Sequence, residues 1–261
     1  MCGRYVVVSS VEVIEKRFNV KAPELPFGPN FNLGPGTLAP VITNDKPKEL
    51  QFFQFGLTPS WAKKKMYLFN ARAEGDANQE NDPAYTGGKG IISKPAFRKP
   101  IRSQRCLVIA DAFIEGTKNE GLDKPFLVYL REGRRPFAFA GIWDTWVNHE
   151  TGEIVNSFAI ITTVPNELMQ KIGHHRSPVI LSERNERTWL RAEHLNEIMS
   201  LLEPYPAEEM NAYPVSPGIK SPKMNDRSLL DPVGERVMTE TDIGIHTELR
   251  LQGMGGQKRD G

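Results

Sequence analysis

Short apolar runs, many of them β-branched or aromatic, recur along the chain and are separated by polar turn residues. Such runs are typical of β-strands in a sheet that is covered on at least one face. The turn signals include Asn119-Glu120-Gly121 and Thr151-Gly152. The pattern predicts strands over residues 4–8, 50–57, 106–110, 126–130, 137–142 and 155–163.

Apolar spacing of three to four residues, which indicates one face of a helix, replaces this pattern in four segments. In the first segment, Ser9 predicts a helix N-cap because Glu12 follows three residues later. Val11, Ile14 and Phe18 then share one helical face. The other helices are predicted near residues 167–172, 183–192 and 195–202.

The order of these elements predicts an α+β protein with a mostly antiparallel β core and peripheral helices, because strands and helices do not alternate as βαβ units. Residues 21–45 are rich in Pro, Gly and Asn and predict an irregular connection, and residues 74–96 predict a long surface loop. No linker divides the chain, so we expect one domain over residues 1–233. Residues 234–261 lose apolar periodicity and predict a flexible C-terminal tail.

Composition narrows the class of protein. The chain has 261 residues, of which 39% are hydrophobic and 25% are charged, as in ordinary globular proteins. Its two cysteines cannot build a disulfide framework, which fits a reducing compartment. We find no apolar run of membrane-spanning length, and Val6-Val7-Val8 is too short for the core of a signal peptide. We therefore expect a cytoplasmic protein that does not bind membranes.

The net charge of +1 hides an uneven distribution. No acidic residue occurs between Pro83 and Ala110, a segment that contains six Lys or Arg residues, and Lys63-Lys64-Lys65 forms a second basic run. Nucleic acid would be drawn to these segments if they folded onto one face, with salt-dependent affinity. Lysine-rich loops that serve only solubility would explain the same composition.

The first five residues, Met1-Cys2-Gly3-Arg4-Tyr5, contain an unusual chemical possibility. Removal of Met1 would leave Cys2 with an α-amine, of pKa about 7.7–8.0, next to a thiol whose pKa of about 8.5 falls beside a cation such as Arg4. This aminothiol can capture an aldehyde as a Schiff base and then close a thiazolidine ring. The same cysteine could instead be an acyl-transfer nucleophile that uses its own amine as the base.

Three further segments place a catalytic type of residue within or beside an apolar run: Asn70, Glu115 and His174. Burial would raise the pKa of the Glu115 carboxyl, as a general acid or base requires, and His174 could titrate near neutral pH. Ordinary alternatives exist for each of them: a capped turn, an ion pair with a lysine, and a surface His-His turn. Adjacent histidines do not share a helical face, and no Cys, Asp or Glu partner has ligand spacing, so we expect no metal site. We also expect no cofactor.

Taken together, the motifs resemble those of the SOS-response-associated peptidase (SRAP) family. The similarity extends to about residue 233. It is carried by Met1–Tyr5, Phe31–Pro35, Gly56–Trp61, Asn70–Glu74, Phe97-Arg98, Arg105–Val108, Ala110–Glu115, His174–Leu181 and Tyr213–Ser216. Departures from the usual family pattern occur at Phe55, Ala112, Gly116 and Ser177, which affect packing more than the reacting groups.

The resemblance implies a barrel-like fold and a protein that shields abasic sites in single-stranded DNA. Cys2 would form the Schiff base and the thiazolidine with the abasic sugar. The family pattern assigns adduct binding to Asn70, proton transfer to Glu115 and assistance at the sugar to His174. It places Arg4, Arg72 and Arg176 on phosphates and Pro35 and Trp61 on bases, and Arg98 lies in the basic segment that we expect to add a phosphate contact.

Two other functions fit the same residues. One is a cysteine peptidase with Cys2 as nucleophile and His174 as base, which could also remove Met1. The other is a single-stranded-DNA-binding module without catalysis. We expect a monomer that joins the nucleoid when it is bound to damaged DNA; the sequence indicates no particular protein partner.

Overall fold

Five strands hydrogen-bond in a closed ring in the part of the chain that the computed structural model describes, residues 3–24 and 26–240. The ring consists of β3 (Leu38–Thr43), β4 (Gln51–Phe55), β10 (Ile154–Thr163), β9 (Phe137–Val147) and β6 (Arg105–Ala110). β10 runs parallel to β4, and the other pairs in the ring are antiparallel. The predicted α+β class with a mostly antiparallel, barrel-like core is confirmed.

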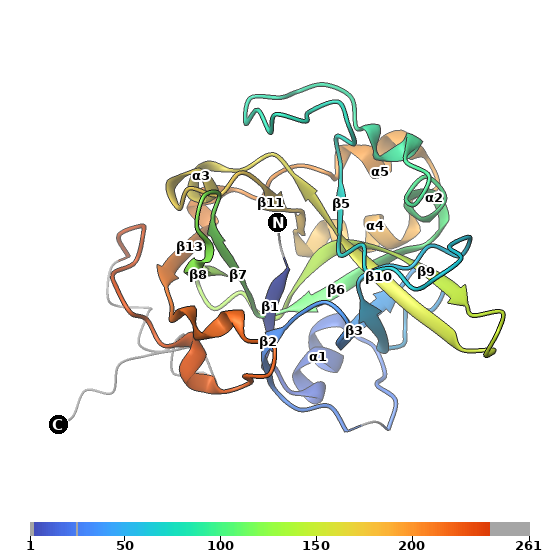
Figure 1. Cartoon of the computed structure of the whole chain (residues 1–261), viewed down its shortest axis with the longest axis horizontal. Coiled ribbons are helices and arrows are strands. Elements are labelled where there is room, and N and C mark those ends of the chain that lie inside the picture. Colours follow the sequence, from blue (N-terminus) through green and yellow to red (C-terminus); the bar gives the residue numbers. More distant parts are fainter. Residues whose placement is uncertain (1–2, 25, 241–261) are drawn as a thin grey trace.

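A second, five-stranded sheet lies beside the barrel, and all its neighbouring strands are antiparallel (Figure 1). Its order is β13 (Met210–Pro214), β8 (Gly121–Leu130), β7 (Ala112–Thr117), β1 (Arg4–Val7) and β2 (Asn30–Leu33). β6 of the barrel leads into β7 of this sheet through the single residue Asp111. This short connection fixes the two sheets against each other.

The described helices are short and peripheral (Figure 1). They are α1 (Val11–Phe18), α2 (Pro100–Ser103), α3 (Glu167–Lys171), α4 (Glu183–Arg191) and α5 (Leu195–Ser200), with 3-10 turns η1 (Gly90–Ser93), η2 (Ala207–Glu209), η3 (Pro217–Lys220) and η4 (Arg227–Leu230). Among the described residues, no helix is long and apolar enough to cross a membrane.

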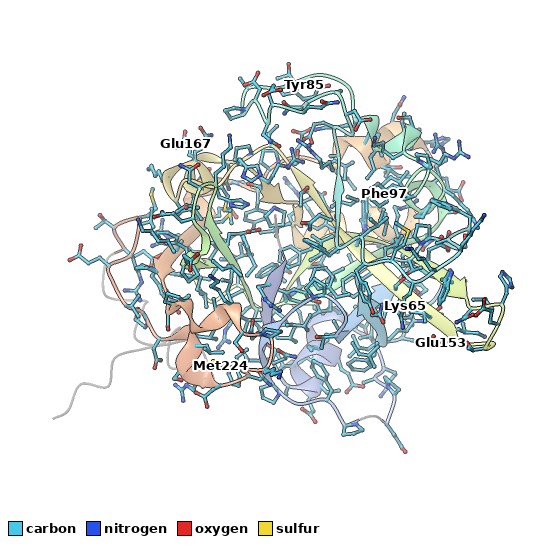
Figure 2. The ribbon with its side chains drawn as sticks, viewed as in Figure 1. Lys65, Tyr85, Phe97, Glu153, Glu167 and Met224 are labelled. Atoms are coloured by element: carbon cyan, nitrogen blue, oxygen red, sulfur yellow. The ribbon has the colours of Figure 1, made fainter. Side chains whose placement is uncertain are left out.

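β1 is buried on both faces, which explains its unbroken apolar sequence. Tyr5 and Val7 pack into the main core, whereas Val6 and Val8 pack into a second apolar cluster behind the sheet. The Tyr5 ring lies 5.4 Å from that of Phe55 and 6.0 Å from that of Phe139, both edge to face. Side chains from both sheets fill the space around this strand (Figure 2).

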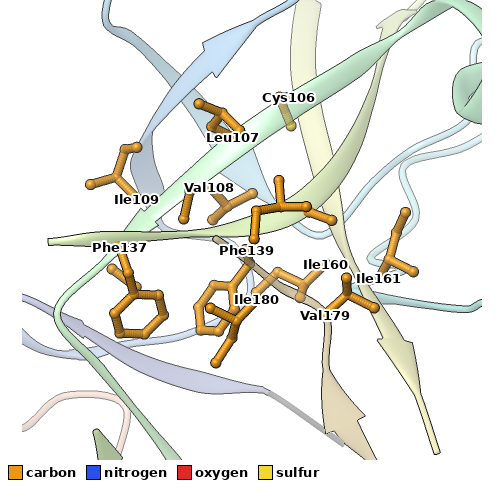
Figure 3. Close-up of a cluster of buried hydrophobic side chains, with 14 of the residues drawn as sticks. Cys106, Leu107, Val108, Ile109, Phe137, Phe139, Ile160, Ile161, Val179 and Ile180 are labelled. Carbon is orange, nitrogen blue, oxygen red and sulfur yellow. The ribbon is translucent and has the colours of Figure 1, made fainter. Parts of the chain in front are cut away.

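β9 and β10 separate at one end, and the chain from residue 177 to 181 fills the gap between them. Its strands β11 (Ser177–Pro178) and β12 (Ile180–Leu181) pair with β10 and β9 respectively. Between them, Val179 N donates to Ile161 O (2.9 Å) and Val179 O accepts from Ala140 N (2.9 Å). Figure 3 shows this segment beside the core residues of both strands. The insertion therefore fixes the polar turn that precedes it in sequence, residues 174–176.

The N-cap of the first helix lies one residue later than predicted. Ser10 is the N-cap, with extended backbone angles, and its side chain accepts from Val13 N at 3.4 Å. Ser9 instead donates its hydroxyl and its backbone N–H to Asp111. A tertiary contact therefore overrides the local capping pattern.

The two segments predicted as irregular contain more structure than their composition indicates. Residues 21–45 include β2 and β3, although the latter contains Pro40. Residues 74–96 contain the 3-10 turn η1 and the buried side chains of Glu74 and Ile91. The prediction for residues 21–45 is wrong because pairing with other segments, and not local sequence, orders β2 and β3. Residues 74–96 form no strand or α-helix and lie mostly at the surface, as predicted for a loop.

Residues 234–240, which the sequence placed in a C-terminal tail, lie against β13 in this structure. Val237 N donates to Ala212 O at 2.8 Å, and Met238 N donates to Asn211 Oδ1 at 3.0 Å. The Asn211 amide in turn donates to Glu240 Oε1 at 2.7 Å. The rest of the predicted tail, residues 241–261, lies outside the described residues.

We predict that Asp111→Ala lowers the free energy of unfolding by about 2–4 kcal/mol, because each buried N–H left without an acceptor costs about 1–3 kcal/mol. Asp111 accepts from Val8 N (2.6 Å) and Ser9 N (2.8 Å) and is 1% exposed. Urea unfolding measures the change. Asp123→Ala, which removes an exposed carboxylate paired with Lys220, is the control and should cost less than about 1 kcal/mol. Equal losses in the two variants would contradict this role for Asp111.

Candidate active site

Glu115 is a buried carboxyl group on β7, next to the start of β1. β7 pairs with β1 so that Ile114 is opposite Arg4. The Glu115 side chain is 4% exposed, and this burial raises its pKa from 4.5 to about 7. A carboxyl group with that pKa exists in both protonation states near neutral pH, as a general acid or base must.

His174 is held against this carboxyl group by the turn that follows α3. Gly173, with φ of +73°, turns the chain, and His174 N donates to Met169 O at 2.8 Å. The imidazole Nδ1 lies 2.6 Å from Gly116 O, and Nε2 lies 3.4 Å from Glu115 Oε2. A carbonyl oxygen only accepts, so Nδ1 carries the proton, and in the neutral ring the Nε2 lone pair faces Glu115.

Burial acts on both groups in the direction that favours their neutral forms. It lowers the pKa of His174 from 6.5 to about 4 while it raises that of Glu115. Near neutral pH, a protonated Glu115 therefore faces an imidazole that can accept a proton. The pair can pass one proton between its members or to a molecule bound beside it.

His175 is a neighbour of this pair that the sequence did not single out. Its ring lies 4.9 Å from that of His174, and burial together with the adjacent imidazole lowers its pKa to about 4. The His174 and His175 rings are thus a partly buried pair in a tilted arrangement, and the exposed surface turn that was the alternative interpretation does not describe them. The doubled histidine was a visible signal, but its burial depends on tertiary packing.

Asn70 and Arg72 lie on one face of the short strand β5 (Asn70–Arg72). β5 runs parallel to β10, with Asn70 beside Ile160 and Arg72 beside Thr162. Asn70 Nδ2 donates to the carbonyl of Phe69 at 3.1 Å. The strand therefore places an amide and a guanidinium two residues apart beside the same strand of the barrel.

The loop that follows β5 holds the Arg72 side chain. Its Nη2 donates to Asn78 O at 2.8 Å and to Asn81 Oδ1 at 2.5 Å. Asn78 is buried, and Asn81 has a left-handed backbone with φ of +57°. No role was predicted for these asparagines, although asparagine is one of the few residues that adopt this conformation readily.

Arg176 is buried, at 2% exposure, and forms an ion pair with Glu74. Its Nη2 lies 2.7 Å from Glu74 Oε2 and 2.8 Å from Thr162 O, and Glu74 also accepts from Thr163 at 3.0 Å. In this conformation Arg176 joins β10 to the end of β5. Its contact with phosphate stays a prediction.

The other predicted DNA-binding residues lie on separate segments. Arg4 lies across Gly34, where a β-carbon would come within 1.8 Å of its Nη1, so this glycine gives the guanidinium room beside Pro35. Pro35 is exposed, and Trp61 is 60% exposed on the loop after β4. Arg98 is exposed just before α2, on a segment distinct from those that carry Glu115 and His174.

Cys2, the predicted nucleophile, lies outside the described residues. The other cysteine, Cys106, is buried in the barrel, and burial raises the pKa of its thiol. A buried thiol of this kind is a poor nucleophile. Cys106 is therefore no substitute for Cys2 in thiol chemistry.

In the described part of the chain, no group of three or more His, Cys, Asp or Glu residues could hold a metal ion. A cavity of about 310 Å³ opens between the start of α4 and Tyr205, but its lining includes none of the predicted site residues. The candidate active site is therefore the pair Glu115–His174 with its neighbours on β1 and β5.

Comparison with known proteins gives consistent matches over most of the chain. The model of the family described as SOS response associated peptidase (SRAP) matches residues 1–222. The abasic site processing protein YoqW of Bacillus subtilis is 37% identical over 240 residues, covering 88% of this chain and 99% of that protein. The abasic site processing protein YedK of Escherichia coli is 26% identical, covering 89% of this chain and 100% of its own length.

A solved structure of a protein from Bacteroides thetaiotaomicron has the same fold. It superposes with a TM-score of 0.74 at 28% sequence identity, covering 89% of this chain and 100% of that one.

We predict that Glu115→Gln becomes more stable relative to wild type as the pH rises from about 4.5 to 7. The raised pKa of Glu115 contributes stability that is full below its ordinary pKa of 4.5 and is lost by about pH 7. The lowered pKa of His174 contributes the opposite trend between about 4 and 6.5, which both proteins share. Only the first contribution disappears in the variant.

Urea unfolding of both proteins at several pH values measures the difference. Glu120→Gln, which removes an exposed carboxylate after the same strand, is the control and should change the unfolding free energy by less than about 0.5 kcal/mol. A difference between Glu115→Gln and wild type that does not vary with pH would contradict the raised pKa.

Proposed function

The chain belongs to the SOS response associated peptidase (SRAP) family, and from this we propose that it binds abasic sites in single-stranded DNA and captures them covalently through Cys2. Relatives that match most of this chain are named abasic site processing proteins. The single observation that carries the proposal is the buried Glu115–His174 pair beside the start of β1.

The register of β1 supports the participation of Cys2. Arg4 is opposite Ile114 in an antiparallel pair, so Gly3 is level with Glu115. Gly3 is the residue that directly follows Cys2 in the sequence. The described chain therefore begins, at Gly3, beside the strand that carries the buried carboxyl of the proton-transfer pair.

The proposed reaction joins the Cys2 amine and thiol to one carbon atom. After Met1 is removed, the amine attacks the C1′ aldehyde of the ring-opened abasic sugar and forms a carbinolamine. Loss of water gives the imine, and the Cys2 sulfur then adds to the imine carbon while its proton moves to nitrogen. The net change is one thiazolidine formed and one water released, and no redox partner or cofactor is required.

Glu115 and His174 would supply the proton transfers in these steps. Ring opening needs a proton at the sugar ring oxygen, and dehydration needs a proton on the departing hydroxyl. Glu115, with a pKa of about 7, can donate either proton near neutral pH, and the neutral imidazole can accept a proton in return. A positioned acid or base contributes about 10²–10⁴-fold to such steps.

The surrounding residues would hold the DNA strand. The half-buried guanidiniums of Arg4 and Arg72 can reach phosphates, and Asn70 can hold the adduct from β5. The exposed Trp61, with Pro35, can stack on bases, which binds single strands with little sequence preference. Arg98 would add a phosphate contact on the approaching strand, and Arg176 would contact a phosphate only if its pair with Glu74 rearranged.

Removal of Met1 is part of the proposal, because an internal Cys2 has no free amine. The protein's own thiol or a cellular aminopeptidase could remove Met1. The crosslinking chemistry requires only that Cys2 has a free α-amine. A monomer and a cytoplasmic location stay predictions.

We predict that Cys2→Ala abolishes the heat-stable adduct with single-stranded DNA carrying an abasic site made by uracil glycosylase. Cys2→Ala and Cys2→Ser both keep the α-amine, so each should give an adduct only after borohydride reduction, because neither has the thiol that closes the ring. A denaturing gel separates these cases. Cys106→Ser is the matched control and should crosslink as wild type. A stable adduct in Cys2→Ala, or peptide cleavage without any adduct in wild type, would contradict the proposal.

We predict that Glu115→Gln and His174→Ala each slow crosslinking at neutral pH by at least about tenfold while DNA affinity stays nearly unchanged. Single-turnover adduct formation gives the rate, and binding to a tetrahydrofuran abasic analogue, which has no aldehyde, gives the affinity. Glu120→Gln and His194→Ala are exposed controls that should leave both unchanged. Equal losses of rate and affinity would make the residue a DNA contact and not a proton donor.

A further inference from the structure

Trp61 has an exposed side chain on a loop whose backbone is fixed immediately on both sides of it. Its side chain is 60% exposed. On one side, Ser60 N donates to Asp144 Oδ2 at 2.8 Å. On the other side, Ala62 O accepts from the indole Nε1 of Trp146 at 2.6 Å. Two side chains of β9 thus hold the residues before and after Trp61.

Asp144 and Trp146 can hold the loop in place because both are buried, at 3% and 4% exposure, and lie two residues apart on one face of β9. Asp144 Oδ1 also accepts from Thr145 N at 2.9 Å and from Gln104 Nε2 at 3.3 Å, so its carboxylate is fixed from both sides. Trp146 packs with Ala62 in a small apolar cluster. The two anchors are therefore rigid themselves.

The remainder of the loop is tied to the same hairpin. Thr58 N donates to Ser157 Oγ on β10 at 2.9 Å, and Leu57 and Leu68 pair across the base of the loop. Lys65 lies 3.1 Å from Glu153 near the tip of the β9–β10 hairpin, where Figure 2 shows both side chains. Because β10 also pairs with β5, this hairpin sets the position of Trp61 relative to Asn70.

We propose that Asp144 and Trp146 are positioning residues that hold Trp61 ready to stack on a base of the bound DNA strand. This rests on the function proposed above, but it assigns a role to two residues that do not themselves touch DNA. A fixed loop loses no backbone freedom when the base binds, so more of the stacking energy becomes affinity. A flexible loop would present the same indole with lower affinity.

The test measures the dissociation constant of the full chain for a single-stranded oligonucleotide that contains a tetrahydrofuran abasic analogue. Trp61→Ala should weaken binding by about 5- to 150-fold, the range for loss of one stacked base. Asp144→Ala should reproduce most of that loss. Asp144→Asn keeps an oxygen that accepts from Ser60 N and should stay within about threefold of wild type.

A double variant separates positioning from general structural damage. If Asp144 acts through Trp61, Asp144→Ala should weaken binding by less than about twofold when Trp61 is already alanine. Trp146→Phe removes the indole N–H and keeps an aromatic ring, so it provides the same comparison if Asp144→Ala does not fold. It should weaken binding only in the presence of Trp61.

Each contrary result has a distinct meaning. Full additivity of the Asp144 and Trp61 changes, or wild-type affinity in Asp144→Ala and Trp146→Phe, overturns the positioning role. Wild-type affinity in Trp61→Ala overturns it as well, while the crosslinking proposal stands. Failure of the wild-type protein to bind the oligonucleotide at all would instead overturn the proposed function, and the positioning role with it.

Discussion

A carboxylic acid buried beside an imidazole keeps its proton to a higher pH than one in water, and the fold holds Glu115 in this situation. The side chains of Glu115 and His174 are each 4% exposed, and their nearest atoms are 3.4 Å apart. The carbonyl oxygen of Gly116, next to Glu115 on β7, accepts a hydrogen bond from the imidazole Nδ1–H and so fixes the tautomer of His174. The proposed proton transfer would therefore depend on one strand that provides both the acid and the group that orients its partner.

β10 brings the other parts of the site into register with that pair. Residues 154–160 of β10 pair with β9 and β4 in the barrel, and residues 160–163 pair with β5 and β11. β11 fixes the turn that carries His174, β5 carries Asn70 and Arg72, and Ser157 of β10 holds the base of the Trp61 loop. Residues that are far apart in sequence are thus positioned by one buried strand, whose burial makes those positions rigid.

Much of this arrangement could be predicted from the sequence, and the rest depended on distant contacts. Apolar runs identified four of the five barrel strands but not β3, and the polar ending of one run identified Glu115. β2 was not predicted because Asn30 and Asn32 are typical of a loop. In the structure the Asn32 side chain is buried, and its amide donates to the carbonyls of Ser221 and Met224. No local pattern in the sequence indicates that Asp144 holds the Trp61 loop, because an aspartate in a strand is ordinarily expected to face solvent. Pattern predicts elements well, but it does not predict which distant backbone groups a polar side chain will satisfy.

The central claim is that the amine and thiol of Cys2 capture the abasic aldehyde, and the most direct test is the site of attachment. The crosslinked product would be digested with nuclease and trypsin, which cleaves after Arg4, and then sequenced by tandem mass spectrometry. The account predicts the deoxyribose remnant on the tripeptide Cys2-Gly3-Arg4. The mass of this product should be one water less than the sum of the peptide and the remnant, and its cysteine should have no free thiol. A remnant on a lysine or on Cys106, or on a peptide that retains Met1, would contradict it.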